Sequence, residues 1–291
     1  MCDEFTRSDD DEALARRGVS RREFAALGAA AAIAGWAYPA GSEAASPVLT
    51  ERTVQVKTPD GVADAFFVHP AKGVHPGIVL WPDIGGLRDA FKAMARRLAT
   101  SGYAVMAVNQ YYRSAPAPVL DSFAQWRTPE GQAKLKPMIA AINPAATTSD
   151  AKAFIAFLDG QKAVDRKRKI GTHGYCMGGP FTVRTAAASP ARVGAAASFH
   201  GANLVSDDPA SPVKLIAGTG AAFLFAIARN DDARSPGDKD ALKAASLAAH
   251  RPAEIEVYPA DHGWCVPDSP VYDKAAAEKA WSRMLGLFAA L

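Results

Sequence analysis

A short motif around Cys176 has the residue types and spacing of a catalytic nucleophile. Residues 174–178 read Gly-Tyr-Cys-Met-Gly, after an apolar run predicted to be a strand and before a predicted helix. This Gly-x-Cys-x-Gly arrangement is typical of a nucleophile elbow in which Cys replaces Ser, since larger residues at 174 and 178 would clash with backbone. The motif predicts Cys176 as the nucleophile and the Met177 amide as an oxyanion-hole donor. The alternative is an inert, buried cysteine.

An acid and a base follow the cysteine in the order that this chemistry requires. Asp231 and Asp232 come directly after one apolar run, and His262 comes after a later one. Both positions lie where predicted strands end, and in open α/β sheets such ends carry the functional loops. We expect His262 to be the base and one Asp to orient it, the other being a solvated turn or helix-capping residue. His173 and His200 are predicted mainly as core or supporting residues.

The elements that must position these residues alternate between strands and helices. Two alternating runs, 53–58 and 63–69, flank Pro-Asp-Gly and predict an antiparallel hairpin. Later apolar runs do not alternate, as expected for parallel strands buried on both faces: 77–81, 104–108, 169–175, 194–199, 222–228 and 254–258. Helical patterns fall at 87–101, 134–159, 177–188, 238–250 and 273–291. The sequence predicts one doubly wound, mainly parallel α/β domain over residues 46–291, with 111–150 as either a lid or a plain connection.

The first 45 residues read as an export signal rather than as part of the fold. An acidic stretch is followed by Arg21-Arg22 and by a weakly apolar run of Ala and Gly over 25–40. This order predicts a twin-arginine signal, recognised by the twin-arginine export machinery and removed near the small residues Ser42, Ala44 and Ala45. A membrane anchor is the alternative, but the run is short and contains Pro39. We expect a periplasmic or secreted protein with no stable membrane insertion after processing.

Composition excludes several classes of protein. The 33 Lys and Arg against 30 Asp and Glu give a net charge of +3, and no basic stripe suited to nucleic acid is present. Three cysteines, Cys2, Cys176 and Cys265, lack the paired spacing of a zinc site, and no nucleotide-binding glycine loop is visible. A small-molecule substrate and no cofactor are therefore expected. Cys265 lies three residues after His262, so pairing with Cys176 is one possibility and a small buried residue is the other.

Through these and neighbouring motifs, the chain resembles the dienelactone hydrolase family of α/β hydrolases. The resemblance covers residues 52–290 and depends on Gly174-Tyr175-Cys176-Met177-Gly178-Gly179, Asn230-Asp231, Tyr258-Pro259-Ala260-Asp261-His262-Gly263 and Pro82-Asp83-Ile84-Gly85-Gly86. It implies the α/β-hydrolase fold and a Cys176, His262 and Asp231 triad. The spacing to Pro236 would instead select Asp232 as the acid.

The resemblance also implies roles for residues around the substrate. Ile84 would supply the second oxyanion-hole amide. Asp83 stands where the family has a Glu that contacts the resting thiol and swings away as the thiolate forms. The alternative role of Asp83 is to cap the helix that follows. Arg113 matches an Arg that binds a substrate carboxylate, with a surface Arg as the alternative. Val266 stands where the family has a second such Arg, and Trp264 on the same loop would make the pocket more apolar.

These observations together predict a hydrolase of a lactone or small carboxylic ester that acts through an acyl-thioenzyme. Two alternatives stay open. One is a general esterase acting on acetylated or xenobiotic esters. The other is a non-catalytic or redox-sensing protein on the same fold.

Overall fold

A computed structural model describes residues 10–12, 14–15 and 47–291. Among these residues, eight strands form one sheet in the order β1-β2-β4-β3-β5-β6-β7-β8. Strands β1 and β2 form an antiparallel hairpin, β2 pairs antiparallel with β4, and all later pairs are parallel. The strands are β1 (Leu49–Thr58), β2 (Gly61–Pro70), β3 (Gly77–Trp81), β4 (Ala104–Val108), β5 (Ile170–Tyr175), β6 (Val193–Phe199), β7 (Ala222–Ala228) and β8 (Ala253–Tyr258).

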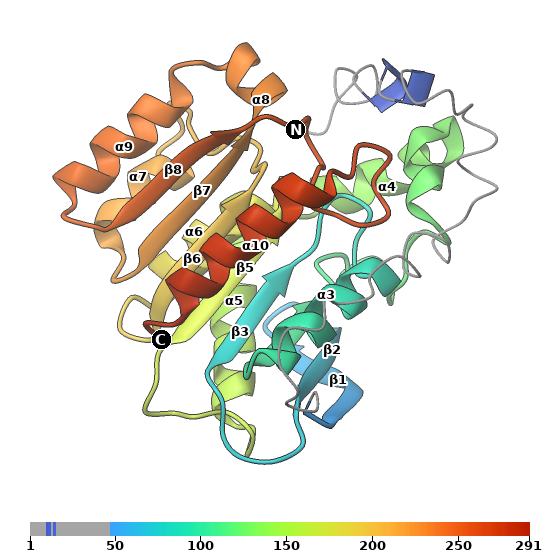
Figure 1. The fold of residues 1–291 in the computed structure, drawn as a ribbon. Helices are drawn as coiled ribbons and strands as arrows, with labels where there is room; N and C mark the ends of the chain where they lie inside the picture. The colour runs from blue at the N-terminus through green and yellow to red at the C-terminus, as the bar shows by residue number, and fades with distance from the viewer. Residues whose placement is uncertain (1–9, 13, 16–46) are drawn as a thin grey trace.

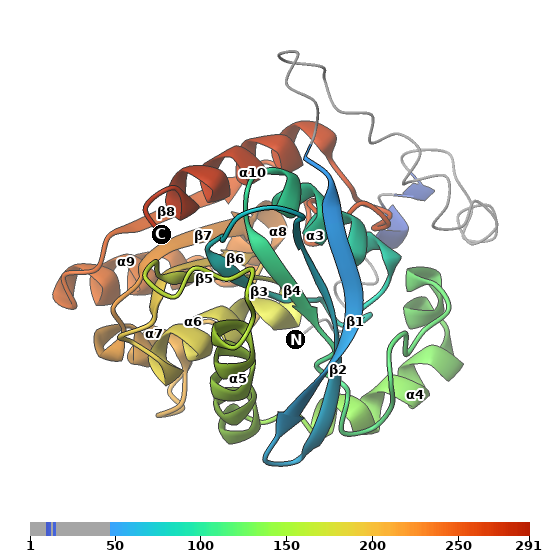
Figure 2. The ribbon, with the colours of Figure 1, turned by 90° about the horizontal axis from the view of Figure 1, so that it is seen from below.

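Helices cover both faces of the sheet. Figure 1 and Figure 2 show α3 and α10 on one face and α5 and α6 on the other. The helical segments are α3 (Asp89–Thr100), η1 (Phe123–Arg127), α4 (Pro129–Ala140), α5 (Pro144–Asp159), η2 (Cys176–Gly178), α6 (Gly179–Ala188), α7 (Pro212–Leu215), η3 (Ile216–Gly218), α8 (Arg229–Arg234), α9 (Asp238–Ala248) and α10 (Lys274–Phe288).

Central strands are continuously apolar because each serves two cores. In β3, Ile78 and Leu80 pack in the cluster that includes α3 and α10. Val79 and Trp81 pack in the cluster that includes α5 and α6. Side chains of a strand alternate between its faces, so a strand covered on both sides needs apolar residues at every position. The predicted single α/β-hydrolase domain with its N-terminal hairpin is confirmed.

The predicted elements differ from the structure mainly at their ends. Strands β3, β4 and β7 have the predicted bounds. The predicted helix over 134–159 is instead two helices, because the side chain of Asn143 caps a new helix, α5, that begins at Pro144. Apart from 10–12 and 14–15, which are helical, the predicted export signal lies outside the described residues.

The carboxyl ends of the parallel strands meet at one edge of the sheet. The loops after β3, β5, β6, β7 and β8 all begin there, and they carry most of the residues that the sequence singles out. Over this edge the connection from β4 to α5 forms a third apolar cluster, in which Trp126 and Leu135 pack with Ile84 and Cys176. The connection therefore covers the site, as a lid-like excursion would.

Candidate active site

The backbone turns sharply at Cys176, between β5 and η2. Its φ of 53° is left-handed, a conformation that costs a residue with a side chain on the order of 1–3 kcal/mol. Two glycines make the turn possible. A Cβ on Gly174 would overlap the carbonyl oxygen of Gly178, and a Cβ on Gly178 would lie 2.5 Å from the carbonyl oxygens of Trp81 and Pro82. The backbone thus has the geometry of a nucleophile elbow.

The two described cysteines have different environments. The Cys176 sulfur lies in a disulfide, so nucleophilic chemistry at this residue requires its reduced form. Cys265 is free and buried, and burial raises the pKa of its thiol well above the usual value. The pairing of Cys176 with Cys265 that the sequence left open is therefore absent, and Cys265 is a weakly acidic thiol packed in the core.

His262 is paired with Asp231 and not with its neighbour in sequence. The Nδ1 atom of His262 lies 2.7 Å from Oδ2 of Asp231, and the backbone N–H of His262 donates to Oδ1 of Asn230 at 2.9 Å. Asp232 turns away and accepts a hydrogen bond from Lys239 at 2.6 Å. A carboxylate at Nδ1 holds the proton there and leaves Nε2 as the basic atom.

The peptide before Ile84 has a fixed orientation. Gln110 donates through Nε2 to the carbonyl of Asp83 at 2.7 Å. Because the N–H of a trans peptide points opposite to its carbonyl, the Ile84 N–H points away from Gln110. The Tyr111 hydroxyl donates to the carbonyl of Ile84 at 2.8 Å and contacts the sulfur of Met177 at 3.2 Å. The two predicted oxyanion-hole residues, Ile84 and Met177, are therefore joined through one tyrosine.

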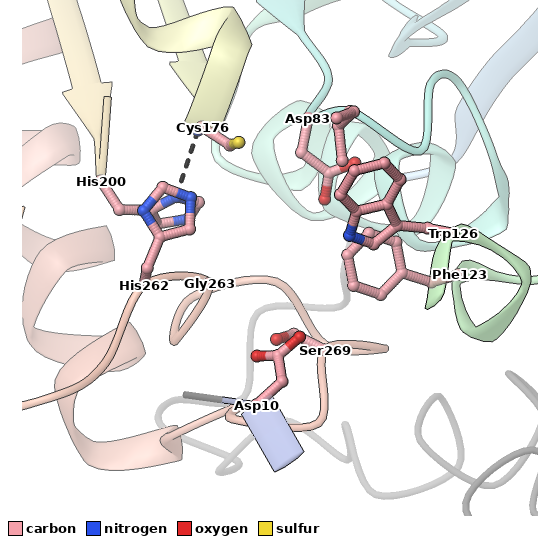
Figure 3. A pocket seen from close by; sticks show the side chains of 10 residues that line it. Asp10, Asp83, Phe123, Trp126, Cys176, His200, His262, Gly263 and Ser269 are labelled. Atoms are coloured by element: carbon pink, nitrogen blue, oxygen red, sulfur yellow. Dashed lines mark hydrogen bonds between the residues drawn. The ribbon is translucent and has the colours of Figure 1, made fainter. Parts of the chain in front are cut away.

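His200 supports the elbow from the end of β6. Its Nδ1 atom lies 3.1 Å from the backbone nitrogen of Cys176 (dashed line in Figure 3). A backbone N–H only donates, so Nδ1 accepts and the neutral ring carries its proton on Nε2. Burial, with a smaller contribution from His262, lowers the pKa of His200 well below its usual value. The predicted supporting residue thus holds the elbow backbone as a neutral imidazole.

Cys176, His200, His262 and Ile84 line one pocket (Figure 3). Aromatic rings of η1 form one wall and the histidines form the opposite wall. The lining residues are Asp10, Asp83, Ile84, Phe123, Trp126, Cys176, His200, His262, Gly263 and Ser269. Asp10, which belongs to the helical residues 10–12, pairs with Arg127 at 3.1 Å. Apart from the two histidines, the side chains of this list include no basic group.

Asp83 lines the pocket and is held in a buried ion pair. Its two carboxylate oxygens accept hydrogen bonds from Arg88 at 2.7 and 2.9 Å, and one also accepts from the Gly85 amide at 2.8 Å. Helix α3 begins at Asp89 with no side-chain cap, so Asp83 does not cap it. Asp83 is thus an ion-paired carboxylate in this structure, and its role as a thiol switch stays a prediction.

Arg113 lies away from the pocket. Its guanidinium donates to both carboxylate oxygens of Asp150, at 2.7 and 2.8 Å, and to Asp60 at 3.0 Å, and it stacks over Tyr112. With these donors committed to two carboxylates, the structure does not bring Arg113 to a substrate. Its expected role in binding a substrate carboxylate is therefore corrected to a structural ion pair.

Trp264 is also absent from the pocket wall. The ring is fully buried, stacks on Tyr258 with centroids 5.2 Å apart and meets the edge of His200. Val266 is likewise buried in the core. The expected contact of Trp264 with substrate is corrected to support of the His200 ring, and the apolar wall comes from Phe123 and Trp126 instead.

Sequence reasoning missed the residues that depend on long-range contacts. Arg88, Phe123 and Trp126 lie in segments without a motif, so no signal pointed to them. His200, by contrast, is predicted as a supporting residue, because it ends a strand at the same sheet edge as Cys176.

Metal-ligand clusters and membrane-spanning helices are both missing from the described part of the chain. Within residues 10–12, 14–15 and 47–291, no group of three or more His, Cys, Asp or Glu could hold a metal ion. Of the helices in that same part of the chain, none has the length and apolar character to cross a membrane.

Known proteins that resemble this chain carry related names. The model of the dienelactone hydrolase family matches residues 63–291. A provisionally named carboxymethylenebutenolidase of Methylorubrum extorquens is 30% identical over 241 residues, covering 81% of this chain and 79% of its own length. A provisionally named carboxymethylenebutenolidase of Salmonella typhi is 28% identical over 274 residues, covering 87% and 96%.

Solved structures share the fold at lower identity. A provisionally named dienelactone hydrolase of Klebsiella pneumoniae superposes with a TM-score of 0.72 at 22% identity, over 84% of this chain and all of that chain. A dienelactone hydrolase-like promiscuous phosphotriesterase from metagenomic libraries gives a TM-score of 0.68 at 22% identity, over 83% and 98%.

Proposed function

The chain belongs to the dienelactone hydrolase family, whose members are hydrolases acting on lactones or esters, and on that premise we propose that it uses a Cys176, His262 and Asp231 triad. The observation that carries the proposal is the convergence in one pocket of a strained elbow cysteine and a histidine paired through Nδ1 with an aspartate. The left-handed backbone at Cys176 costs free energy, so stability alone does not explain it.

The proposed reaction has two stages. The reduced Cys176 gives its proton to Nε2 of His262, and the sulfur attacks the carbonyl carbon of the ester or lactone. The amides of Ile84 and Met177 stabilise the tetrahedral oxyanion. As the carbon–oxygen bond breaks, His262 returns the proton to the leaving alkoxide, which in a lactone stays attached to the acyl chain. Water then loses a proton to His262 and attacks the thioester, which releases the carboxylic acid and the thiol.

We propose a neutral substrate. The residues that line the pocket include aromatic and aliphatic side chains and the carboxylate of Asp83. The guanidinium of Arg113 is bound to Asp60 and Asp150. A substrate carboxylate needs a cation to offset its desolvation. A neutral lactone or a small neutral ester avoids that cost, and general esters of this kind stay the nearest alternative substrates.

Hydrolysis by the full chain in the presence of reductant tests the proposal. We expect turnover of small lactones or p-nitrophenyl esters, and loss of several orders of magnitude in kcat for Cys176→Ala, because the nucleophile is removed. Cys265→Ala is the matched control, a second buried cysteine outside the pocket wall. If Cys176→Ala keeps more than about a tenth of the activity, the assignment is refuted. Activity on neither substrate class would favour a binding protein.

We also propose that residues 1–45 are a twin-arginine export signal and that the protein works in the periplasm or outside the cell. The order of Arg21-Arg22, weakly apolar run and small residues supports this. Removal of the signal would also take Asp10 out of the pocket. Replacing both arginines by lysine should keep the protein in the cytoplasm by cell fractionation, and unchanged export would contradict the proposal.

A further inference from the structure

Arg88 joins two loops of the active site through a buried ion cluster. Its Nε and NH2 groups donate to Asp268 at 2.6 and 2.8 Å, and its NH1 and NH2 groups donate to Asp83 at 2.7 and 2.9 Å. A fifth contact runs from NH1 to the carbonyl of Gly86 at 3.2 Å. All three charged side chains are almost fully buried. We propose that Arg88 is the positioning residue that sets the oxyanion hole against the catalytic histidine, an inference that rests on the proposed function.

The sheet by itself does not fix these two loops against each other. Asp83 directly precedes Ile84 on the loop after β3, and Asp268 follows His262 by six residues on the loop after β8. Strands β3 and β8 are four places apart in the sheet, which at about 4.8 Å per strand is roughly 19 Å. The two loops converge above the sheet edge, and Arg88 joins them there, because its one guanidinium binds a carboxylate from each loop.

The cluster requires an arginine. A guanidinium has five N–H donors in a planar fork, and the five contacts use each nitrogen, whereas an ammonium has three donors and no fork. Burial alone would lower the pKa of Arg88, but Asp268 and Asp83 raise it above its usual value, so the group stays charged. The guanidinium also stacks over Phe91 and over the pocket residue Phe123, at 4.8 and 4.6 Å from the ring centroids.

Gly85 leaves the space in which the guanidinium lies. A Cβ at this position would be 2.8 Å from NH1 of Arg88 and 2.9 Å from the ring of Phe123. Both distances are shorter than Cβ contacts in folded proteins, so the buried guanidinium of Arg88 and the partly buried ring of Phe123 would have to shift. Gly85→Ala should therefore disturb the cluster without changing its charge.

The variant Arg88→Lys tests the proposal, with Arg113→Lys as control. Lysine keeps the positive charge of the cluster but cannot bridge both carboxylates. Arg113 also binds an aspartate through two donors, yet lies outside the pocket. For a neutral p-nitrophenyl ester we expect the kcat of Arg88→Lys to fall about 100-fold, the loss typical of a 1 Å misplacement. Its KM should stay within about threefold of wild type, because oxyanion contacts act mainly in the transition state.

Alkylation of Cys176 by iodoacetamide separates positioning from general damage. Alkylation needs the thiolate but no oxyanion hole, so its rate in Arg88→Lys should stay within about threefold of wild type under reducing conditions. Gly85→Ala should reproduce the same pattern, and it provides the test if Arg88→Lys does not fold. Equal kcat in Arg88→Lys and Arg113→Lys would overturn the proposal, as would parallel losses of kcat and alkylation. Failure of the wild type to hydrolyse any ester would instead refute the proposed function.

Discussion

Replacing Asp231 by Asn should remove most of the activity without changing the fold. In the wild type, Asp231 accepts the Nδ1 proton of His262 at 2.7 Å and its charge stabilises the imidazolium that forms during the reaction. An amide has no charge and favours the wrong imidazole tautomer. The same change in a serine protease triad lowers kcat by about 10⁴, so we expect a loss of about 10³ to 10⁴, or roughly 4–5.5 kcal/mol in the barrier.

Asp232→Asn is a closely matched control. The side chain of Asp232 is 21% exposed and that of Asp231 is 23% exposed, so solvent screening acts on both to the same degree. Asp232 pairs with Lys239 at 2.6 Å, and loss of such a surface pair costs about 0–1 kcal/mol of stability. Its kcat should stay within about threefold of wild type. Both variants are assayed with a p-nitrophenyl ester under reductant, and equal losses, or a larger loss for Asp232→Asn, would refute the assignment of the acid.

Three further predictions concern stability and substrate preference. Burial lowers the pKa of His173 to about 3, so below about pH 6.5 the unfolded chain binds the proton that the folded chain excludes. Urea unfolding should then show wild-type stability falling by about 1.6 kcal/mol between pH 6.5 and 5.0 from this group. A slope unchanged in His173→Phe would contradict this. Gly178→Ala should lower the free energy of unfolding by about 1–3 kcal/mol, because its Cβ would overlap backbone carbonyls. Gly286→Ala lies in open space within α10 and should raise that free energy by up to about 1 kcal/mol. Thermal melts that rank the two variants the other way would show that the elbow is less constrained. Finally, kcat/KM for neutral esters should exceed that for acidic esters of matched size, and a preference for the acidic series would mean that a cation reaches the pocket.

Local patterns in the sequence determined the strands and the elbow. Strands β3, β4 and β7 are predictable to the residue because burial on both faces requires an unbroken apolar run. The elbow is predictable because Gly174 and Gly178 flank Cys176 at a spacing that only a sharp turn requires. The order of nucleophile, acid and base along the chain follows from their positions after successive strands.

Only the tertiary structure decided which side chains meet. Asp231 and Asp232 are adjacent in sequence and of the same residue type, and the direction in which each leaves α8 determines that His262 meets the first. Arg113 has the sequence context of a substrate-binding residue, but Asp60 and Asp150, which lie far from it in sequence, bind its donors. Arg88 lacked any motif and yet joins loops four strands apart. Backbone conformation follows from patterns a few residues long, whereas contacts between buried charges depend on how distant elements pack and where each charge finds its partner.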